Sequence, residues 1–244
     1  MQDRFSPEFR ENLWELMRWR RDVRRFRTDP VEAAVLDRCL RAFTLAPSVG
    51  LSEPWRLIRV ESPDVRAALM RNFEASNARA LACYEGERAA LYARLKLEGL
   101  REAPVQIAVF CDDTTAKGAG LGAGTMPEAR AYSVVGAINL FWLALRAEGL
   151  GLGWVSILDN NALKALLGLP KGVIPVAYLC LGHVRGFHRR PELETAGWRR
   201  RLPLADHVHV DGWGKAGADE TLAGRIRDDQ AATEAGRFLE ERLG

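Results

Sequence analysis

The sequence predicts an α+β domain, or a three-layer α/β domain, that holds few strands and much helix. Its 244 residues, 48% of them hydrophobic, are enough to bury one substantial core. The expected order of elements is helix, helix, strand, helices, strand, core helix, strand, helix, strand. No internal repeat is visible along the chain.

Several stretches repeat their apolar residues at the spacing of a helix. The first covers residues 9–19, and further helices are expected at about 65–73, at 131–145 and at 160–167. Another has a clear start signal, in which Asp29 is the expected N-cap, Pro30 lies in the first turn and Glu32 completes a capping box. The helix at 131–145 is apolar nearly all round, so it belongs in the core or in a subunit interface.

Four short apolar stretches predict strands, at residues 57–60, 104–111, 152–158 and 174–181. Ser156 lies inside the third of them. Residues 46–55 contain two prolines and a glycine, and they predict a loop. Residues 74–100 are polar and rich in Ala, Arg and Glu, which fits either a mobile helical cover or an ordinary pair of surface helices.

Composition excludes several classes of protein. The formal net charge of +3 is mild, and the basic clusters lack interleaved aromatic residues, so we expect no nucleic-acid partner. No uninterrupted apolar run is long enough to span a bilayer, and the first ten residues carry no apolar signal segment. The four cysteines are far apart and read as free thiols. We therefore expect a cytoplasmic protein with no membrane partner.

Two other patterns invite a site and are rejected. The glycine-rich stretch 118–124 does not follow a strand directly, and Pro127 interrupts the helix that a dinucleotide-binding fingerprint requires. His207 and His209 share one side of an extended chain, but a third ligand at fitting spacing is missing. We expect a surface loop at the first and no metal site at the second.

The stretch with the clearest chemistry is Arg20-Arg21-Asp22-Val23-Arg24-Arg25-Phe26, in which four arginines surround one carboxylate. Arginine grips phosphate through paired N–H donors, and neighbouring positive charge keeps an acid ionised. Because the stretch lies between two helical patterns, we expect it to be extended, with Arg20, Asp22 and Arg24 on one side. We interpret it as a segment that binds a phosphorylated cofactor and supplies a reactive acid. A charge run that merely faces water is the alternative.

These residues resemble the nitroreductase-like flavoprotein superfamily. Residues 20–24 are similar to its Arg-Arg-Ser-x-Arg, and residues 46–55 to its Ala-Pro-Ser-x-x-Asn-x-Gln-Pro-Trp. Asp22 stands where ordinary nitroreductases carry Ser, and Leu51 and Glu53 replace Asn and Gln. The stretches 92–104, 125–133 and 149–159 agree with the branch of the superfamily that destroys flavin. The resemblance covers roughly residues 7–213.

The resemblance implies a nitroreductase-like three-layer α/β/α sandwich with a mostly antiparallel central sheet, assembled as an intertwined homodimer with FMN at the subunit interface. Residues 1–213 would form the FMN-binding domain. Residues 214–244 would be a C-terminal arm that is docked on the partner subunit or partly disordered.

The resemblance also implies the reaction. Reduced FMN is a substrate in this branch, with molecular oxygen as the co-substrate. The products are 5,6-dimethylbenzimidazole, which is the lower ligand of cobalamin, and erythrose 4-phosphate. A separate flavin reductase would supply the reduced FMN.

Site residues follow from the same resemblance. The phosphate and ribityl oxygens would be held by Arg20, Arg21, Arg24, Arg199 and Arg201. Which of residues 199–201 meets the phosphate stays open. Ser48 would touch the flavin. Asp22 matches the family's acid, and a carboxylate there could remove a proton near the ribityl carbon attached to the flavin. Ser156 matches a serine whose hydroxyl would hydrogen-bond the flavin ring. Taken alone, Asp22 reads as a salt-bridge partner and Ser156 as a hydroxyl bonded to the backbone.

Two other functions remain open from the sequence. One is a conventional NAD(P)H-dependent nitroreductase with bound FMN, against which Asp22 in the serine position argues. The other is a flavin-binding module without catalysis.

Overall fold

The structure is a computed structural model that describes residues 4–215, and it divides into two compact units, residues 1–192 and 193–244. The first unit holds a four-stranded sheet in the order β1-β2-β4-β3, with every neighbouring pair antiparallel. The strands are β1 (Trp55–Arg59), β2 (Val105–Asp112), β3 (Gly151–Val155) and β4 (Val173–Gly182). β2 and β4 form the centre of this sheet, and β1 and β3 are its edges.

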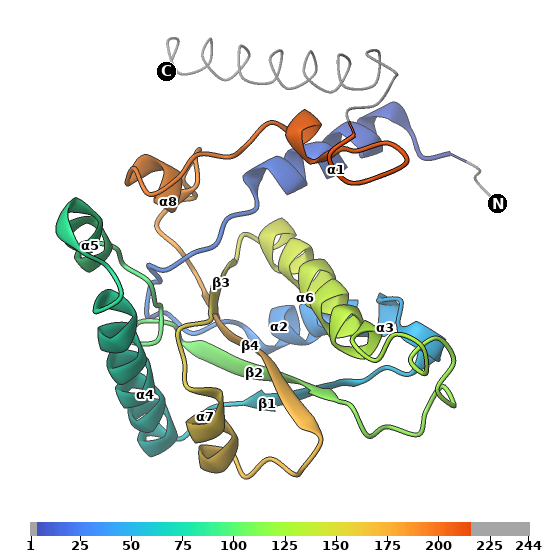
Figure 1. Ribbon diagram of the computed structural model, residues 1–244, viewed down its shortest axis with the longest axis horizontal. Coiled ribbons are helices and arrows are strands. Elements are labelled where there is room, and N and C mark those ends of the chain that lie inside the picture. The colour runs from blue at the N-terminus through green and yellow to red at the C-terminus, as the bar shows by residue number, and fades with distance from the viewer. Residues whose placement is uncertain (1–3, 216–244) are drawn as a thin grey trace. The chain divides into compact units, whose positions relative to one another are not determined.

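Helices surround this sheet in the first unit (Figure 1). They are α1 (Pro7–Trp19), α2 (Ala33–Leu40), α3 (Ala42–Leu45), α4 (Pro63–Leu81), α5 (Gly86–Ala93), α6 (Ala129–Ala147) and α7 (Asn160–Leu166), with the 3-10 turn η1 (Val49–Leu51) before β1. The short helix α8 (Glu192–Thr195) lies at the division between the units, and η2 (Leu204–His207) belongs to the second.

Side chains of the central strands alternate between two cores, as the twofold repeat of a strand requires. Val105, Ile107 and Val109 pack in one cluster with residues of α2, α3 and α6. Ala108 and Phe110 pack in the other cluster with residues of α4 and α7. The sheet therefore lies between two helical layers, which confirms the predicted α/β/α sandwich with an antiparallel sheet.

The most apolar helix, α6, takes the buried place expected of it, since Val134, Ile138 and Phe141 are fully buried. The first helix is different. None of the residues of α1 is buried, and the apolar side chains of Phe9 and Trp14 are exposed. Much of its apolar face is therefore left uncovered by the part of the chain that the structure describes.

Two local predictions are wrong. Asp29 does not cap α2, because its carboxylate accepts a hydrogen bond from Arg27 Nε at 2.8 Å, and the helix starts instead after Glu32. Ser156 is not inside a strand. Pairing of β3 with β4 ends at Val155, next to a bulge in β4 that leaves Val176 out of the register, and Ser156 follows as an exposed residue.

The polar stretch 74–100 forms the end of α4, then α5, then an irregular segment, which fits a pair of surface helices. Residues 118–124 form turns, as expected of a surface loop. Residues 216–244 of the expected C-terminal arm lie outside the described residues, and the domain boundary at 213/214 stays a prediction.

Candidate active site

A cavity of about 620 Å³ lies along the arginine segment. Residues 21–26 form one side of it, and Lys96 and Glu102 contribute from a distant part of the sequence. Residues 185–188 and Glu192 complete the lining. Its volume falls in the range of about 300–1,000 Å³ that is usual for small-molecule sites.

The arginine segment is extended, as predicted, and it lies against the free edge of β3. Val23 N donates to Leu152 O at 2.9 Å, and Asp22 forms a parallel bridge with Leu152. Gly153 makes this approach possible, because a Cβ at that position would lie 1.9 Å from Val23 O. The edge of the sheet therefore fixes the backbone that carries Asp22.

The carboxylate of Asp22 replaces a backbone acceptor at this edge. Trp154 N donates to Asp22 Oδ1 at 2.9 Å, and Arg24 Nη2 donates to Asp22 Oδ2 at 2.7 Å. Burial raises the pKa of Asp22 above its ordinary value of 3.8, against the opposing effects of Arg24, the Trp154 N–H and Arg20. The side chain still keeps 32% of its surface exposed. The Asp22 carboxylate therefore has a fixed orientation, a raised pKa and a place in the lining of a cavity. These properties suit a proton acceptor.

Arg21 has mainly a structural place. Its guanidinium donates to the carbonyl oxygens of His188 at 2.9 Å and of Arg20 at 2.8 Å, and also to those of Arg18 and Arg189. These bonds occupy four of the five N–H donors of an arginine. Arg21 thus ties residues 188–189, of which His188 lines the cavity, to the end of α1.

Arg20 and Arg24 lie in different surroundings. The Arg20 guanidinium lies 4.5 Å from the ring centroid of Trp142 in α6, and it does not line the cavity. Arg24 does line it, is only 13% exposed, and lies between Asp22 and Glu192. Among the three arginines of residues 20–24, Arg24 thus combines a place in the cavity with side-chain contacts to carboxylates.

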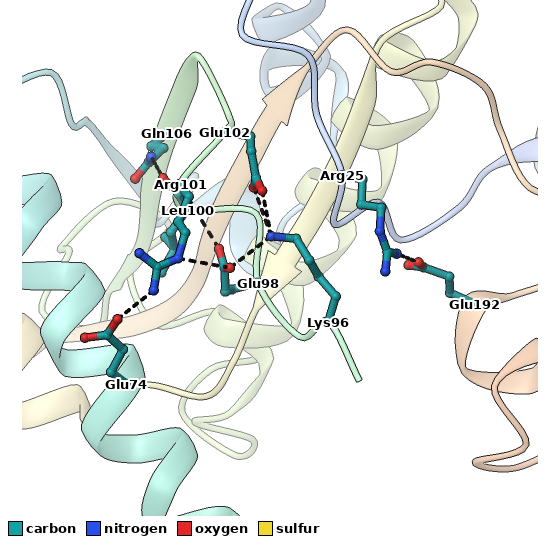
Figure 2. A network of polar contacts seen from close by, with 9 residues as sticks. All are labelled: Arg25, Glu74, Lys96, Glu98, Leu100, Arg101, Glu102, Gln106 and Glu192. Carbon is teal, nitrogen blue, oxygen red and sulfur yellow. Dashed lines mark hydrogen bonds and ion pairs between the residues drawn. The ribbon is translucent and has the colours of Figure 1, made fainter. Parts of the chain in front are cut away.

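The opposite wall carries a second charged group (Figure 2). Lys96 Nζ donates to Glu102 Oε1 at 2.8 Å and to Glu98 Oε1 at 3.0 Å, and Glu98 is only 7% exposed. Burial by itself would lower the pKa of Lys96, but the bonds to Glu102 and Glu98 raise it above the ordinary value. The ammonium therefore stays charged at neutral pH.

Lys96, Glu102 and Glu192 were not among the predicted site residues. A signal was present for the first two, because the stretch 92–104 is one of those that match the flavin-destroying branch. Arg25 lies within the predicted binding segment but was given no role, and it lines the cavity together with Glu192. Nothing in the sequence pattern around Glu192 pointed to the arginine segment.

Ser48 lies far from Asp22 within one chain. It belongs to the loop before β1, where Glu53 N donates to Ser48 Oγ at 3.0 Å. β1 begins opposite Cys111, whereas Asp22 lies beside Leu152, which pairs with Leu181, and Leu181 in turn pairs with Val105 at the other end of the sheet. β1 and β3 are opposite edges of the sheet, and the start of β1, which the Ser48 loop precedes, lies on the order of 20 Å along the strands from the level of Leu152.

The loop around Ser48 is also strained. Leu51 and Glu53 adopt the left-handed backbone conformation, with φ of 54° and 44°. Bulky residues rarely adopt it, and such strain concentrates at ligand sites. Leu51 is one of the two positions at which this loop departs from the superfamily pattern, where Asn would accept the same conformation more readily.

The remaining predicted site residues lie elsewhere. Ser156 lines a separate cavity of about 140 Å³ beside Tyr178 and Leu163. Arg199 and Arg201 are exposed residues of the second unit, and their binding of phosphate stays a prediction. Over residues 4–215, no group of three or more His, Cys, Asp or Glu side chains is arranged to hold a metal ion. Nor does any helix of that range have the length and apolarity to cross a membrane.

Comparison with known proteins adds relatives of high similarity. The chain is 53% identical over 199 residues to a 5,6-dimethylbenzimidazole synthase of Rhodospirillum rubrum, a match that covers 82% of this chain and 94% of the relative. It is 48% identical over 199 residues to the 5,6-dimethylbenzimidazole synthase of Rhodobacter capsulatus, covering 82% and 96%.

Solved structures agree on the fold. A structure of oxidized iodotyrosine deiodinase bound to FMN and 3-iodo-L-tyrosine matches with a TM-score of 0.61 and 24% identity, over 72% of this chain and 91% of that one. A nitroreductase-like protein from Bacillus cereus matches with a TM-score of 0.58 and 20% identity, over 87% and 100%. At such identities the likeness concerns the fold alone.

The pattern of the Nitroreductase family matches residues 17–183, which include the arginine segment, the sheet and both cores. The same assignment follows from the antiparallel sandwich and from the relatives that share about half of their residues with this chain. The chain belongs to the nitroreductase family.

Proposed function

We propose that this protein is an oxidoreductase that uses molecular oxygen to fragment reduced FMN into 5,6-dimethylbenzimidazole and erythrose 4-phosphate. The observation that carries the proposal is the carboxylate of Asp22, held at the edge of an arginine-lined cavity with its basicity raised. The names of the relatives at 46–53% identity support the same reaction. The product would then serve cobalamin biosynthesis.

The residues of the cavity suit the phosphate end of FMN. Arg24, Arg25, Lys96 and Arg185 give it several positive charges, and phosphate is the anion that guanidinium groups bind through paired donors. We propose that Arg20 and Arg24 hold the phosphate and the ribityl oxygens, as the sequence predicts, with Arg25 as a further candidate from the lining of the same cavity. Arg21, whose donors are largely taken by backbone carbonyl oxygens, keeps the segment in place. Arg199 and Arg201 remain candidates for a further phosphate contact.

Asp22 is proposed to act as the base. Reduced flavin supplies the electrons that activate oxygen when it is bound, and the chain itself has to move a proton. A carboxylate that Trp154 N–H and Arg24 hold in one orientation can take a proton from the ribityl carbon next to the flavin ring. Ser156 is proposed to hydrogen-bond the flavin ring from the segment that follows β3.

A homodimer would complete the site. Ser48 and Asp22 lie at opposite corners of the sheet, so one chain cannot place both against one flavin. A second copy could bring its own Ser48 loop to the cavity. The exposed apolar side chains of Phe9, Leu13 and Trp14 on α1 offer a surface that such a copy would cover. We therefore propose an intertwined dimer with two equivalent sites.

A separate flavin reductase is proposed to deliver the reduced FMN, and the cytoplasm is the proposed location. The described residues hold no helix that could cross a membrane.

The proposal is tested by giving the purified protein chemically reduced FMN and admitting air. We expect 5,6-dimethylbenzimidazole to form in proportion to the protein, as measured by chromatography and mass spectrometry. Steady oxidation of NAD(P)H with a nitroaromatic acceptor, without the benzimidazole, would instead establish a conventional nitroreductase. Flavin that binds and is recovered intact after repeated reduction and oxygenation would leave only a binding module.

A further inference from the structure

The glycine loop, residues 118–124, lies directly against the Ser48 loop, residues 48–53. A Cβ added to Gly118 would lie 2.5 Å from Gly50 O, and a Cβ added to Gly50 would lie 2.9 Å from Leu121 O. Side chains essentially never come so close to a backbone oxygen, so both positions require glycine. Both also have a positive φ, of 85° at Gly118 and 57° at Gly50, which other residues rarely adopt. The two loops therefore pack backbone against backbone.

Two side chains fasten the Ser48 loop in the same place. Ser133 Oγ in α6 accepts a hydrogen bond from Val49 N at 3.0 Å and donates one to Ala129 O at 2.6 Å. Lys117, directly before the glycine loop, forms an ion pair with Glu53. This pair is partly exposed and contributes less. The Ser48 loop is thus attached near its start to α6 and at its end to the glycine loop.

These contacts stabilise a conformation that is unfavourable for an isolated loop. Leu51 and Glu53 have the left-handed backbone, with φ of 54° and 44°. In this conformation Glu53 N donates to Ser48 Oγ at 3.0 Å, which fixes the hydroxyl and leaves its own proton able to be donated to a ligand. Leu51 is 69% exposed, so the tip of the loop stays accessible.

We propose that the glycine loop is a positioning element of the active site: it holds the Ser48 loop so that the Ser48 hydroxyl can donate a hydrogen bond to the flavin ring. Gly118 and Ser133 are the positioning residues. The ring carries carbonyl oxygens that accept such a bond. That the ligand is a flavin held by a second copy rests on the proposed function, whereas the holding of the Ser48 loop rests on contacts within one chain.

Two glycines of the same loop provide a matched pair of variants. Gly118→Ala and Gly120→Ala both place alanine at a positive φ, of 85° and 76°. Only the first adds a Cβ against the Ser48 loop, because a Cβ at Gly120 would meet nothing within 4 Å among the described residues. A difference between the two variants therefore reports the contact between the loops and not the strain of the left-handed backbone.

The first measurement is hydrogen exchange of the protein without flavin. Val49, Leu51 and Glu53 donate their backbone N–H groups to hydrogen bonds, so the exchange of these amides reports opening of the Ser48 loop. Exchange should be faster than in the wild type in Gly118→Ala and unchanged in Gly120→Ala.

The second measurement is the affinity for oxidised FMN and for riboflavin, each titrated by its fluorescence. Gly118→Ala should bind both about fivefold more weakly, which corresponds to the loss of one hydrogen bond. The loss should be equal for the two ligands, because riboflavin lacks only the phosphate. Gly120→Ala should bind both as the wild type does.

Ser133→Ala tests the attachment to α6 and serves as the second variant if Gly118→Ala does not fold. It removes the acceptor of Val49 N, so exchange at that amide should be faster and both flavins should bind about two- to fivefold more weakly. Ser133→Thr keeps a hydroxyl and should restore the exchange and the affinity of the wild type.

Several results would overturn the proposal. Faster exchange with unchanged flavin affinity would make the glycine loop a structural brace without a role in binding. Equal behaviour of Gly118→Ala and Gly120→Ala, unchanged exchange and affinity in Ser133→Ala, or a loss for FMN that riboflavin does not share would each contradict it, as would a wild type that binds neither flavin. Flavin recovered intact after oxygenation would contradict the proposed function and leave these binding results standing.

Discussion

Replacing Asp22 by Asn removes the proposed base and changes little else. The amide oxygen can still accept the hydrogen bond that Trp154 N donates to Oδ1, so the segment keeps its attachment to β3. The contact with Arg24 is lost, but Arg24 remains near Glu192 and is not left without a carboxylate. The substitution therefore separates the proton-accepting role of Asp22 from its structural role.

The expected loss of activity is large and the expected loss of stability is small. A positioned general base contributes roughly 10²–10⁴-fold to a rate, which corresponds to about 3–5 kcal/mol of the barrier. The loss of one partly exposed ion pair changes the free energy of unfolding by at most about 1 kcal/mol. We thus expect fragmentation of reduced FMN to fall at least about a hundredfold, while FMN binds within a few-fold of the wild-type affinity.

The assay mixes anaerobically loaded protein with oxygenated buffer and quantifies the benzimidazole after a single turnover. Asp29→Asn is the control, because Asp29 likewise pairs with an arginine two residues away at 2.8 Å and lies outside the cavity. It should retain full activity. Fragmentation by Asp22→Asn within twofold of the wild type would refute the role of Asp22 as a base, and a complete loss of FMN binding would make Asp22 a structural residue.

Further predictions concern the pH dependence that Asp22 confers, the close approach of Gly153 to Val23 and the buried hydroxyl of Tyr178. Because burial raises the pKa of Asp22 and the base has to be ionised, the fragmentation rate should fall on acidification at a pH above 3.8, with no such limb in the residual rate of Asp22→Asn. The folded protein also binds this proton more tightly than the unfolded chain, so the wild-type free energy of unfolding should fall as pH rises above 3.8, relative to Asp22→Asn in parallel urea titrations. Gly153→Ala should displace the arginine segment, because its Cβ would meet Val23 O at 1.9 Å. We expect it to lower the free energy of unfolding by about 2–3 kcal/mol and to weaken FMN binding. Gly136→Ala in α6 is the control: its Cβ would meet nothing within 4 Å, and the free energy of unfolding should rise by up to about 1 kcal/mol. Tyr178→Phe should lower the free energy of unfolding by about 1–2 kcal/mol, because Tyr178 Oη donates to the buried Gln106 Oε1 at 2.7 Å and Phe leaves that oxygen without this bond. An unchanged midpoint of urea unfolding would contradict this expectation.

The layers of the fold could be predicted because burial leaves a periodic record in the sequence. The strands around Val105 and Leu179 and the helix around Ile138 are apolar in the sequence because they fill the two cores. Errors occurred where a local signal had a competing partner. Asp29 looks like a cap, but Arg27 takes its carboxylate, and Ser156 continues an apolar run whose pairing ends beside the bulge at Val176.

The site could be predicted only where its residues are neighbours in the chain. Asp22 and Arg24 are two residues apart in an extended segment, so their contact follows from the sequence alone. Lys96, Glu102 and Glu192 reach the same cavity through long-range packing, which no spacing or periodicity of the sequence predicts. Only the resemblance of residues 92–104 to the flavin-destroying branch marked the first two. The different functions of four adjacent arginines were also hidden, because carbonyl oxygens of residues 188 and 189 and the ring of Trp142 decide them.

The most direct test of the account is a crystal structure of the protein with FMN bound. We predict the phosphate and ribityl oxygens at arginines of the segment 20–25, the Asp22 carboxylate within hydrogen-bond distance of the ribityl chain beside the flavin ring, and Ser48 of a second copy against the same flavin. An Asp22 carboxylate that faces away from the flavin, with the ring open to bulk water, would contradict the account and favour an ordinary reductase.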